Sequence, residues 1–126
     1  MFADAAVATD DPRIYDAVEA FGGRAVMTSP DHRSGTDRCR EAVDKLGGDP
    51  DVIVNVQGDE PFIAPSQLQA IARCFDDPST DIATLAKPFT EADGLDALEN
   101  PNSPKVVLGS AGQALYFSRS VIPYLR

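Results

Sequence analysis

The chain has 126 residues, 43% of them hydrophobic and 25% charged, and a formal net charge of −9. This length suits one domain with its own core, and the composition is ordinary for a globular protein. The acidic balance argues against general binding to nucleic acids or anionic membranes, and no apolar run approaches the roughly 20 residues that span a bilayer.

The chain up to about residue 98 alternates short apolar strands with amphipathic helices. Strands are predicted at residues 5–9, 25–27, 52–56 and 82–86. Helices are predicted at residues 12–21, 36–46 and 91–98, and from Pro65 to about Phe75. Such alternation is typical of parallel βαβ units.

The pattern changes after Pro101. Residues 105–108 and 114–118 read as two strands around a glycine-containing turn, which predicts a β-hairpin. We therefore expect an α/β fold with a mixed, mostly parallel sheet, flanking helices and a hairpin near the C-terminus. The hairpin belongs either to that mixed sheet or to a dimer arm.

Two cysteines, Cys39 and Cys74, lie in predicted helices and form no Cys-x-x-Cys motif. We interpret them as reduced thiols of a cytoplasmic protein. With a single histidine and no cysteine cluster, the sequence gives no support for a zinc site. Motifs of hydrolase triads, P-loops and common dinucleotide folds are also missing from the sequence.

The most informative segment is residues 52–61, where a Val- and Ile-rich run is followed by Gln-Gly-Asp-Glu-Pro. A strand that is apolar on both faces predicts the buried middle of a parallel sheet. Ligands of such sheets bind beyond the carboxyl ends of the strands, so Asp59 is a candidate ligand of Mg²⁺. The alternative is a capped turn before Pro61, and Glu60 would point to the opposite side from Asp59.

A second candidate site is the segment Ser34-Gly35-Thr36, which leads into a predicted helix. Its N–H groups, its hydroxyls and the helix dipole favour an anion, and Arg38 could add a bidentate contact to a phosphate or a base carbonyl. The alternative is an ordinary N-cap in which Ser34 or Thr36 caps the helix. The histidine, His32, is interpreted as a hydrogen-bonding residue of the loop.

The third candidate is Arg119, at the end of the last predicted strand. A guanidinium suits a planar carboxylate, while the alternative is a solvated arginine at a strand end.

Taken in order, these motifs resemble the 3-deoxy-manno-octulosonate cytidylyltransferase (CMP-Kdo synthetase) family nearly from end to end. The resemblance rests on the segments at residues 8–11, 21–23, 27–28, 31–38, 54–61, 105–107 and 114–123. It implies a Rossmann-like nucleotidyltransferase fold, usually dimeric and cytoplasmic. It also implies transfer of CMP from CTP to 3-deoxy-D-manno-octulosonate (Kdo), with Mg²⁺, for lipopolysaccharide synthesis.

The resemblance also implies residue roles. Asp59 would be catalytic and hold Mg²⁺, and Arg119 would meet the Kdo carboxylate as a catalytic and substrate-binding residue. Gln57 would contact the sugar acid or the nucleotide. The residues around the cytidine and its phosphates would be Ser34, Gly35, Thr36 and Arg38.

The family's basic Pro-Ala-Arg…Pro-Gly-Lys loop does not precede Ala5, and its later segment would follow Arg126. We therefore expect residues 1–126 to be one cytidylyltransferase domain that lacks both parts. Two alternatives stay open: a non-catalytic fragment that folds and dimerises, and a cytidylyltransferase for another sugar acid such as sialic acid.

Overall fold

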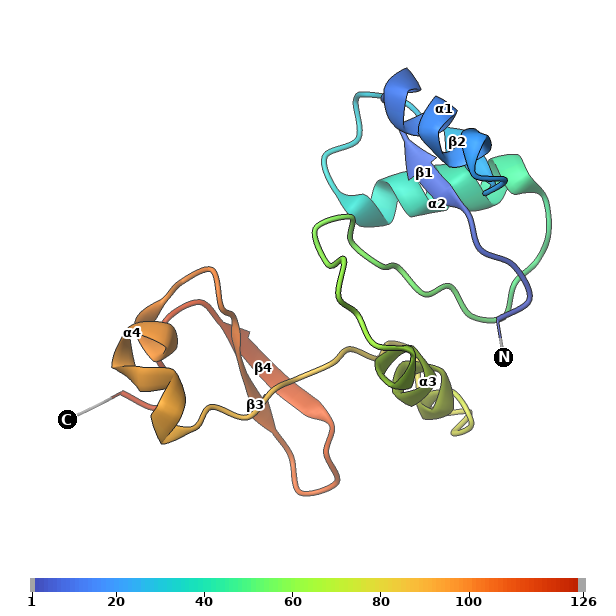
Figure 1. The fold of residues 1–126 in the computed structure, drawn as a ribbon. Helices are drawn as coiled ribbons and strands as arrows, with labels where there is room; N and C mark the ends of the chain where they lie inside the picture. Colours follow the sequence, from blue (N-terminus) through green and yellow to red (C-terminus); the bar gives the residue numbers. More distant parts are fainter. Residues whose placement is uncertain (1, 125–126) are drawn as a thin grey trace. The chain divides into compact units, whose positions relative to one another are not determined.

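The computed structural model describes residues 2–124, and its backbone contacts divide the chain into two compact units. Residues Met1–Ala83 form the N-terminal unit and Thr84–Arg126 form the C-terminal unit. Figure 1 shows the helices and strands of each. None of the helices within residues 2–124 is long and apolar enough to cross a membrane.

A βαβ arrangement begins the N-terminal unit. Strand β1 (Val7–Thr9) pairs in parallel with β2 (Ala25–Met27), and helix α1 (Pro12–Ala20) connects them. Parallel neighbours need such a crossover because the chain must return to the same end of the sheet. The two strands were predicted at these positions, and so was the helix between them.

Helix α1 begins where the sequence predicts. Asp11 is its N-cap and accepts a hydrogen bond from the Arg13 backbone N–H over 2.8 Å, while Pro12 occupies the first turn. After Phe21 the chain turns at Gly22, whose φ of +80° is disfavoured for residues with a side chain. The glycine thus turns the chain toward β2.

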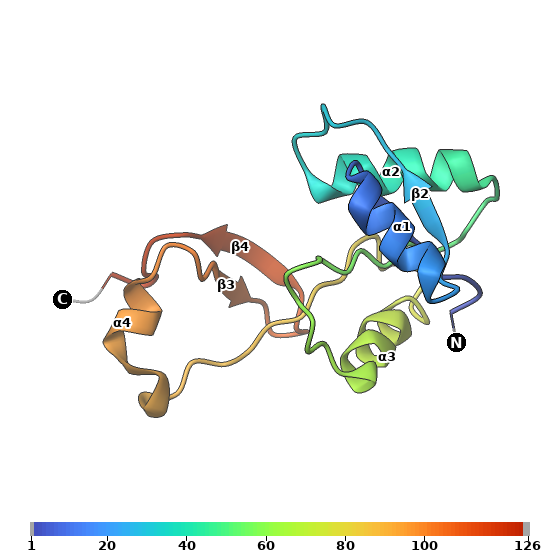
Figure 2. The same cartoon turned by 45° about the horizontal axis from the view of Figure 1, so that its top comes forward.

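Helix α2 (Gly35–Leu46) follows β2 and ends at Gly47, with φ of +65°. Both α1 and α2 pack against β1 and β2, and Figure 2 shows the two helices beside β2. The buried apolar side chains come one from each of three elements: Val18 of α1, Val26 of β2 and Ala42 of α2. The core is therefore small and lies between these helices and strands.

Helix α3 (Pro65–Cys74) contacts no other helix or strand among the described residues. Its N-terminus is closed by the Gln67 side chain, which accepts from the Ala64 N–H over 2.7 Å. Of the residues that helical spacing predicts on its inner face, Leu68, Ile71 and Phe75 are half-buried, whereas Ala72 is exposed.

Two predicted strands are absent from the structure. Residues 52–56 have no strand assignment, and Ile53 and Val56 are 50% and 44% exposed, so the buried strand expected there is wrong. Residues 82–86 likewise form no strand. A strand exists only through hydrogen bonds to a neighbour, and within residues 2–124 the only strand pairs are β1–β2 and β3–β4.

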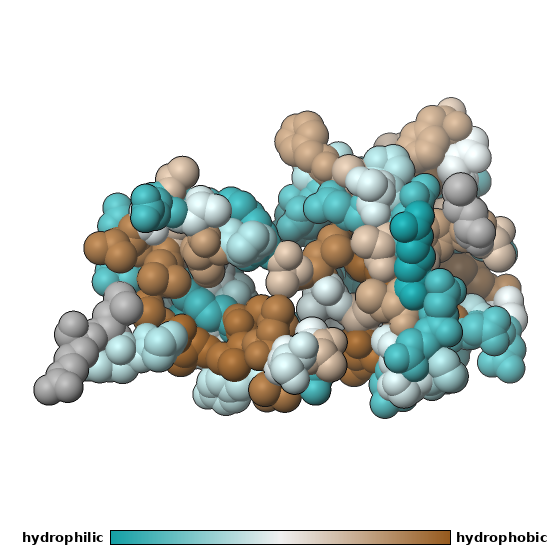
Figure 3. Space-filling model, turned by 90° about the horizontal axis from the view of Figure 1, so that it is seen from below, coloured by the Kyte–Doolittle hydropathy of each residue, from teal (hydrophilic) through white to brown (hydrophobic). Residues whose placement is uncertain are grey.

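The C-terminal unit contains the predicted hairpin. A 3₁₀ turn (Glu91–Asp93) and helix α4 (Gly94–Glu99) precede strands β3 (Lys105–Leu108) and β4 (Ala114–Ser118), which pair antiparallel. Lys105 is buried, and its ammonium donates to the Asn100 carbonyl over 2.7 Å. Large apolar side chains reach the surface in both units (Figure 3).

Candidate functional site

The carboxyl ends of β1 and β2 are joined to α2 by one guanidinium. Arg38 Nη1 donates to Thr28 Oγ1 over 2.6 Å and to the Ser29 carbonyl over 3.3 Å. Its Nη2 lies 3.3 Å from Asp10 Oδ2. These contacts fix Arg38 at the sheet edge, where ligands of parallel sheets bind, and leave part of its five N–H donors for a ligand.

The N-terminus of α2 has the N-cap that the sequence offered as the alternative to an anion site, with Ser34 as the capping residue. Ser34 Oγ accepts from the Asp37 backbone N–H over 3.1 Å and donates to Asp37 Oδ2 over 2.7 Å. Within the described residues, the backbone N–H groups of Gly35 and Thr36 make no hydrogen bond. Free N–H groups at the positive end of a helix are a binding site for an anion.

The side chain of Gln57 lies against this N-terminus. A β-carbon built on Gly35 would lie only 2.9 Å from Gln57 Nε2, and 3.4 Å from Asn55 Nδ2. The structure therefore brings together two segments that are more than 20 residues apart in the sequence (Gln57 minus Gly35 is 22). Both were singled out as candidate sites.

Asp59 lies in the turn that begins at Gln57, where the Glu60 N–H donates to the Gln57 carbonyl over 3.1 Å. Its carboxylate is exposed, and it makes no hydrogen bond or ion pair with the rest of the described chain. It is accessible, but it does not end a buried strand as the sequence predicted.

No group of three or more His, Cys, Asp or Glu side chains within residues 2–124 could hold a metal ion alone. Mg²⁺ commonly takes one or two carboxylates together with substrate phosphates and water. The accessible carboxylate of Asp59 fits a Mg²⁺ ion whose other ligands are phosphate oxygens and water. The described residues do not fit a metal centre built from protein ligands alone.

Sequence reasoning missed Glu41. Its carboxylate accepts from the Ser29 N–H over 3.0 Å, pairs with Lys45 Nζ over 2.7 Å and contacts the imidazole of His32. The bonds from Lys45, the Ser29 N–H and His32 lower the pKa of Glu41 to about 2. A Glu four residues before a Lys on a predicted helix was the available signal. The contact agrees with the interpretation of His32 as a loop organiser.

Arg119 belongs to the C-terminal unit, where its Nη1 donates to the Pro101 carbonyl over 2.8 Å. This bond holds the side chain close to the hairpin end. It is the one predicted site residue outside the N-terminal unit.

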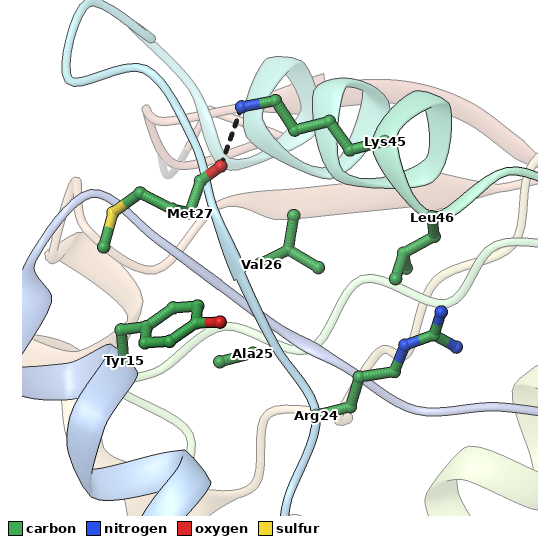
Figure 4. Close-up of a pocket in the computed structure, with 7 residues that line it drawn as sticks. All are labelled: Tyr15, Arg24, Ala25, Val26, Met27, Lys45 and Leu46. Carbon is green, nitrogen blue, oxygen red and sulfur yellow. Dashed lines mark hydrogen bonds between the residues drawn. The ribbon is translucent and has the colours of Figure 1, made fainter.

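A hollow runs beside β2 and contains none of the predicted site residues (Figure 4). Tyr15 of α1 and Lys45 of α2 lie on either side of the strand, and the Lys45 ammonium donates to the Met27 carbonyl over 2.8 Å. Both cations at this hollow already pair with carboxylates: Arg24 with Asp4, and Lys45 with Glu41. It therefore has no cation left unpaired for an anionic ligand.

The model of the family described as cytidylyltransferase matches residues 1–126. A 3-deoxy-manno-octulosonate cytidylyltransferase of Bacteroides thetaiotaomicron is 67% identical over 123 residues, which are 98% of this chain and 49% of that protein. A protein of the same name from Phocaeicola vulgatus is 65% identical, with 98% of this chain and 49% of that protein covered.

A solved structure, of a CMP:2-keto-3-deoxy-manno-octonic acid synthetase complexed with CTP, superposes with a TM-score of 0.86 at 46% identity. The match covers 98% of this chain and 49% of that one. It confirms the predicted α/β fold class. The chain spans about half the length of the relatives it matches. By the family match over its whole length, the chain belongs to the cytidylyltransferase family.

Proposed function

We propose that the chain takes part in the transfer of CMP from CTP to Kdo, which gives CMP-Kdo and pyrophosphate. The observation that carries this proposal is the contact of Gln57 with Gly35, because it joins a carboxylate-bearing turn to a helix N-terminus. The names of the relatives and the CTP complex of the structural neighbour support the same reaction.

In this reaction the 2-hydroxyl oxygen of Kdo forms a bond to the α-phosphorus of CTP. The bond from that phosphorus to the bridging oxygen breaks, pyrophosphate leaves with the electron pair, and the hydroxyl proton passes to solvent. The protein forms no covalent bond here, so its contribution is positioning and electrostatics.

Each predicted residue has a role in this proposal. The N–H groups of Gly35 and Thr36 and the guanidinium of Arg38 orient the nucleotide, and Ser34 keeps α2 capped. Gln57 contacts the nucleotide or the sugar acid beside them. Arg119 binds the Kdo carboxylate through its planar fork.

Asp59 is proposed to hold Mg²⁺, and an exposed carboxylate at the turn after Gln57 supports this. When bound, the ion would neutralise charge on the phosphates. Asp59 would fix its place relative to the helix N-terminus.

We extend the proposal to a cytoplasmic homodimer. Both cysteines are free thiols, which favours a reducing compartment. Self-association is supported by exposed apolar side chains on the hairpin: Leu108, Leu115, Tyr116 and Phe117 are 54–62% exposed.

The test is pyrophosphate release by the purified protein with CTP, Kdo and Mg²⁺. Turnover that requires all three supports the proposal, and omission of Mg²⁺ should abolish it. Sialic acid in place of Kdo is the matched comparison, and a preference for it would assign the sister reaction. A well-folded protein with neither turnover nor CTP binding would favour the non-catalytic alternative.

A further inference from the structure

The loop from Thr28 to Arg33 connects β2 with the N-terminus of α2, and side chains of α2 itself hold it. Arg38, Glu41 and Lys45 are spaced three and four residues apart, so they share one face of the helix. Arg38 bonds to Thr28 and to the Ser29 carbonyl, and Lys45 bonds to the Met27 carbonyl. The helix thus holds the chain segment that leads into its own first turn.

Glu41 is at the centre of these contacts. One carboxylate oxygen accepts from the Ser29 N–H and contacts His32, and the other pairs with Lys45. Its side chain is only 23% exposed. The two loop partners are near opposite ends of the loop, so a single carboxylate fixes the loop at both ends.

A second ion pair on α2, between Arg40 and Asp44, differs from the Glu41 contacts because it lies on the helix surface. Arg40 and Asp44 pair over 3.0 Å with side chains that are 76% and 56% exposed. Asp44 makes no hydrogen bond or ion pair with the described loop residues, so its pair with Arg40 is an ordinary ion pair on the helix surface. Removal of either Glu41 or Asp44 takes one acidic side chain from α2, but only removal of Glu41 takes away contacts to the loop, those with Ser29 and His32.

We propose that Glu41 is a positioning residue of the nucleotide site, which acts through Ser29 and His32 to hold the loop that leads into Ser34, Gly35 and Thr36 at the start of α2. This inference rests on the proposed function. Glu41 touches the loop and not the ligand in this account. A loop that is fixed before binding does not have to be ordered when the nucleotide arrives.

The expected consequence is weaker nucleotide binding with little change in chemistry. Calorimetric titration of the purified protein with CTP and Mg²⁺ should give about tenfold weaker affinity for Glu41→Ala. Glu41→Gln should lose about threefold, because an amide oxygen still accepts from the Ser29 N–H while the charge is gone. Asp44→Ala should bind like the wild type.

Two further readouts separate positioning from general helix stability. Hydrogen exchange at the Ser29 amide should accelerate in Glu41→Ala and stay unchanged in Asp44→Ala. In pyrophosphate release, Glu41→Ala should raise KM for CTP about tenfold and keep kcat within about twofold, as expected for loss of uniform binding.

Wild-type affinity in Glu41→Ala, or equal losses in Glu41→Ala and Asp44→Ala, would overturn the inference and leave the proposed function intact. Absence of CTP binding by the wild type would instead overturn the proposed function, and the inference with it. Should Glu41→Ala fail to fold, the CTP affinity of Glu41→Gln tests the proposal instead, and wild-type affinity in that variant would contradict it.

Discussion

The backbone of Gly35 and the side-chain amide of Gln57 approach so closely that a β-carbon on Gly35 would lie 2.9 Å from Gln57 Nε2. Gly35 is the first residue of α2, and its φ is not in the left-handed region. What a side chain at this position would meet is therefore the end of the Gln57 side chain, while the backbone conformation itself does not require glycine. The contact places Gln57 beside the free N–H groups of the helix.

Replacement of Gly35 by Ala should separate ligand binding from stability. The methyl group displaces the flexible end of Gln57, which costs the fold little, so the free energy of unfolding should change by less than about 1 kcal/mol. Affinity for CTP with Mg²⁺ should fall about tenfold, because the displaced amide occupies the space of the ligand. Chemical denaturation and calorimetric titration measure the two quantities.

Gly109→Ala is the matched control, because a β-carbon there would lie 2.9 Å from the side-chain carbon of Gln113. That collision also displaces a glutamine, but in the hairpin of the C-terminal unit. CTP affinity should stay at the wild-type value. Equal losses of affinity in Gly35→Ala and Gly109→Ala would contradict the role given to Gln57.

The elements that the sequence predicts well are those whose signals are local. Helix α1 has its Asp11 cap and Pro12, and the hairpin at residues 105–118 has two mostly apolar runs around a glycine-containing turn. Caps and turns depend on a few neighbouring residues, so one sequence is enough to locate them. Both appear in the structure with bounds that differ little from the prediction.

The strand predicted at residues 52–56 shows where local signals fail. Apolar side chains on both faces indicate that this segment would be stable as a buried strand. A strand forms, however, only where a neighbouring strand supplies backbone hydrogen bonds, and that neighbour lies elsewhere in the sequence. No strand of residues 2–124 pairs with this segment. The same reasoning explains why the sequence did not single out Glu41. Its contacts with Ser29 and His32 depend on the fold and not on its helical spacing alone.

Asp59→Asn should lower the rate of pyrophosphate release by about 100-fold or more if Asp59 holds Mg²⁺. The exposed carboxylate makes no hydrogen bond or ion pair with other described residues, so the fold and its stability should not change. Glu60→Gln is the neighbouring control and should keep most of the activity. A near-normal rate in Asp59→Asn at saturating CTP, Kdo and Mg²⁺ would reject the assignment.

If Arg119 binds the Kdo carboxylate as proposed, Arg119→Ala should chiefly raise KM for Kdo, by about tenfold or more, because a charge-assisted pair would be lost. Arg119→Lys should restore only part of the affinity, since an ammonium cannot form the planar two-bond contact. KM for CTP serves as the internal reference and should change little. A rise in KM for CTP alone would place Arg119 at the nucleotide instead.

The pH dependence of stability should report the N-cap of α1. The Arg13 side chain and its backbone N–H both bond to Asp11 and lower its pKa from 3.8 to about 2. A carboxyl group whose pKa is lower in the folded state stabilises the fold fully above pH 3.8, and this stabilisation disappears as the pH falls through about 2.

Asp11→Asn keeps a capping oxygen and cannot titrate. The difference in free energy of unfolding between wild type and Asp11→Asn should therefore shrink between pH 4 and pH 2, as urea denaturation at several pH values can measure. Arg13→Ala should reduce that pH dependence, because the backbone N–H groups of residues 13 and 14 alone then favour the ionised form, and an undiminished dependence would contradict the assigned cause.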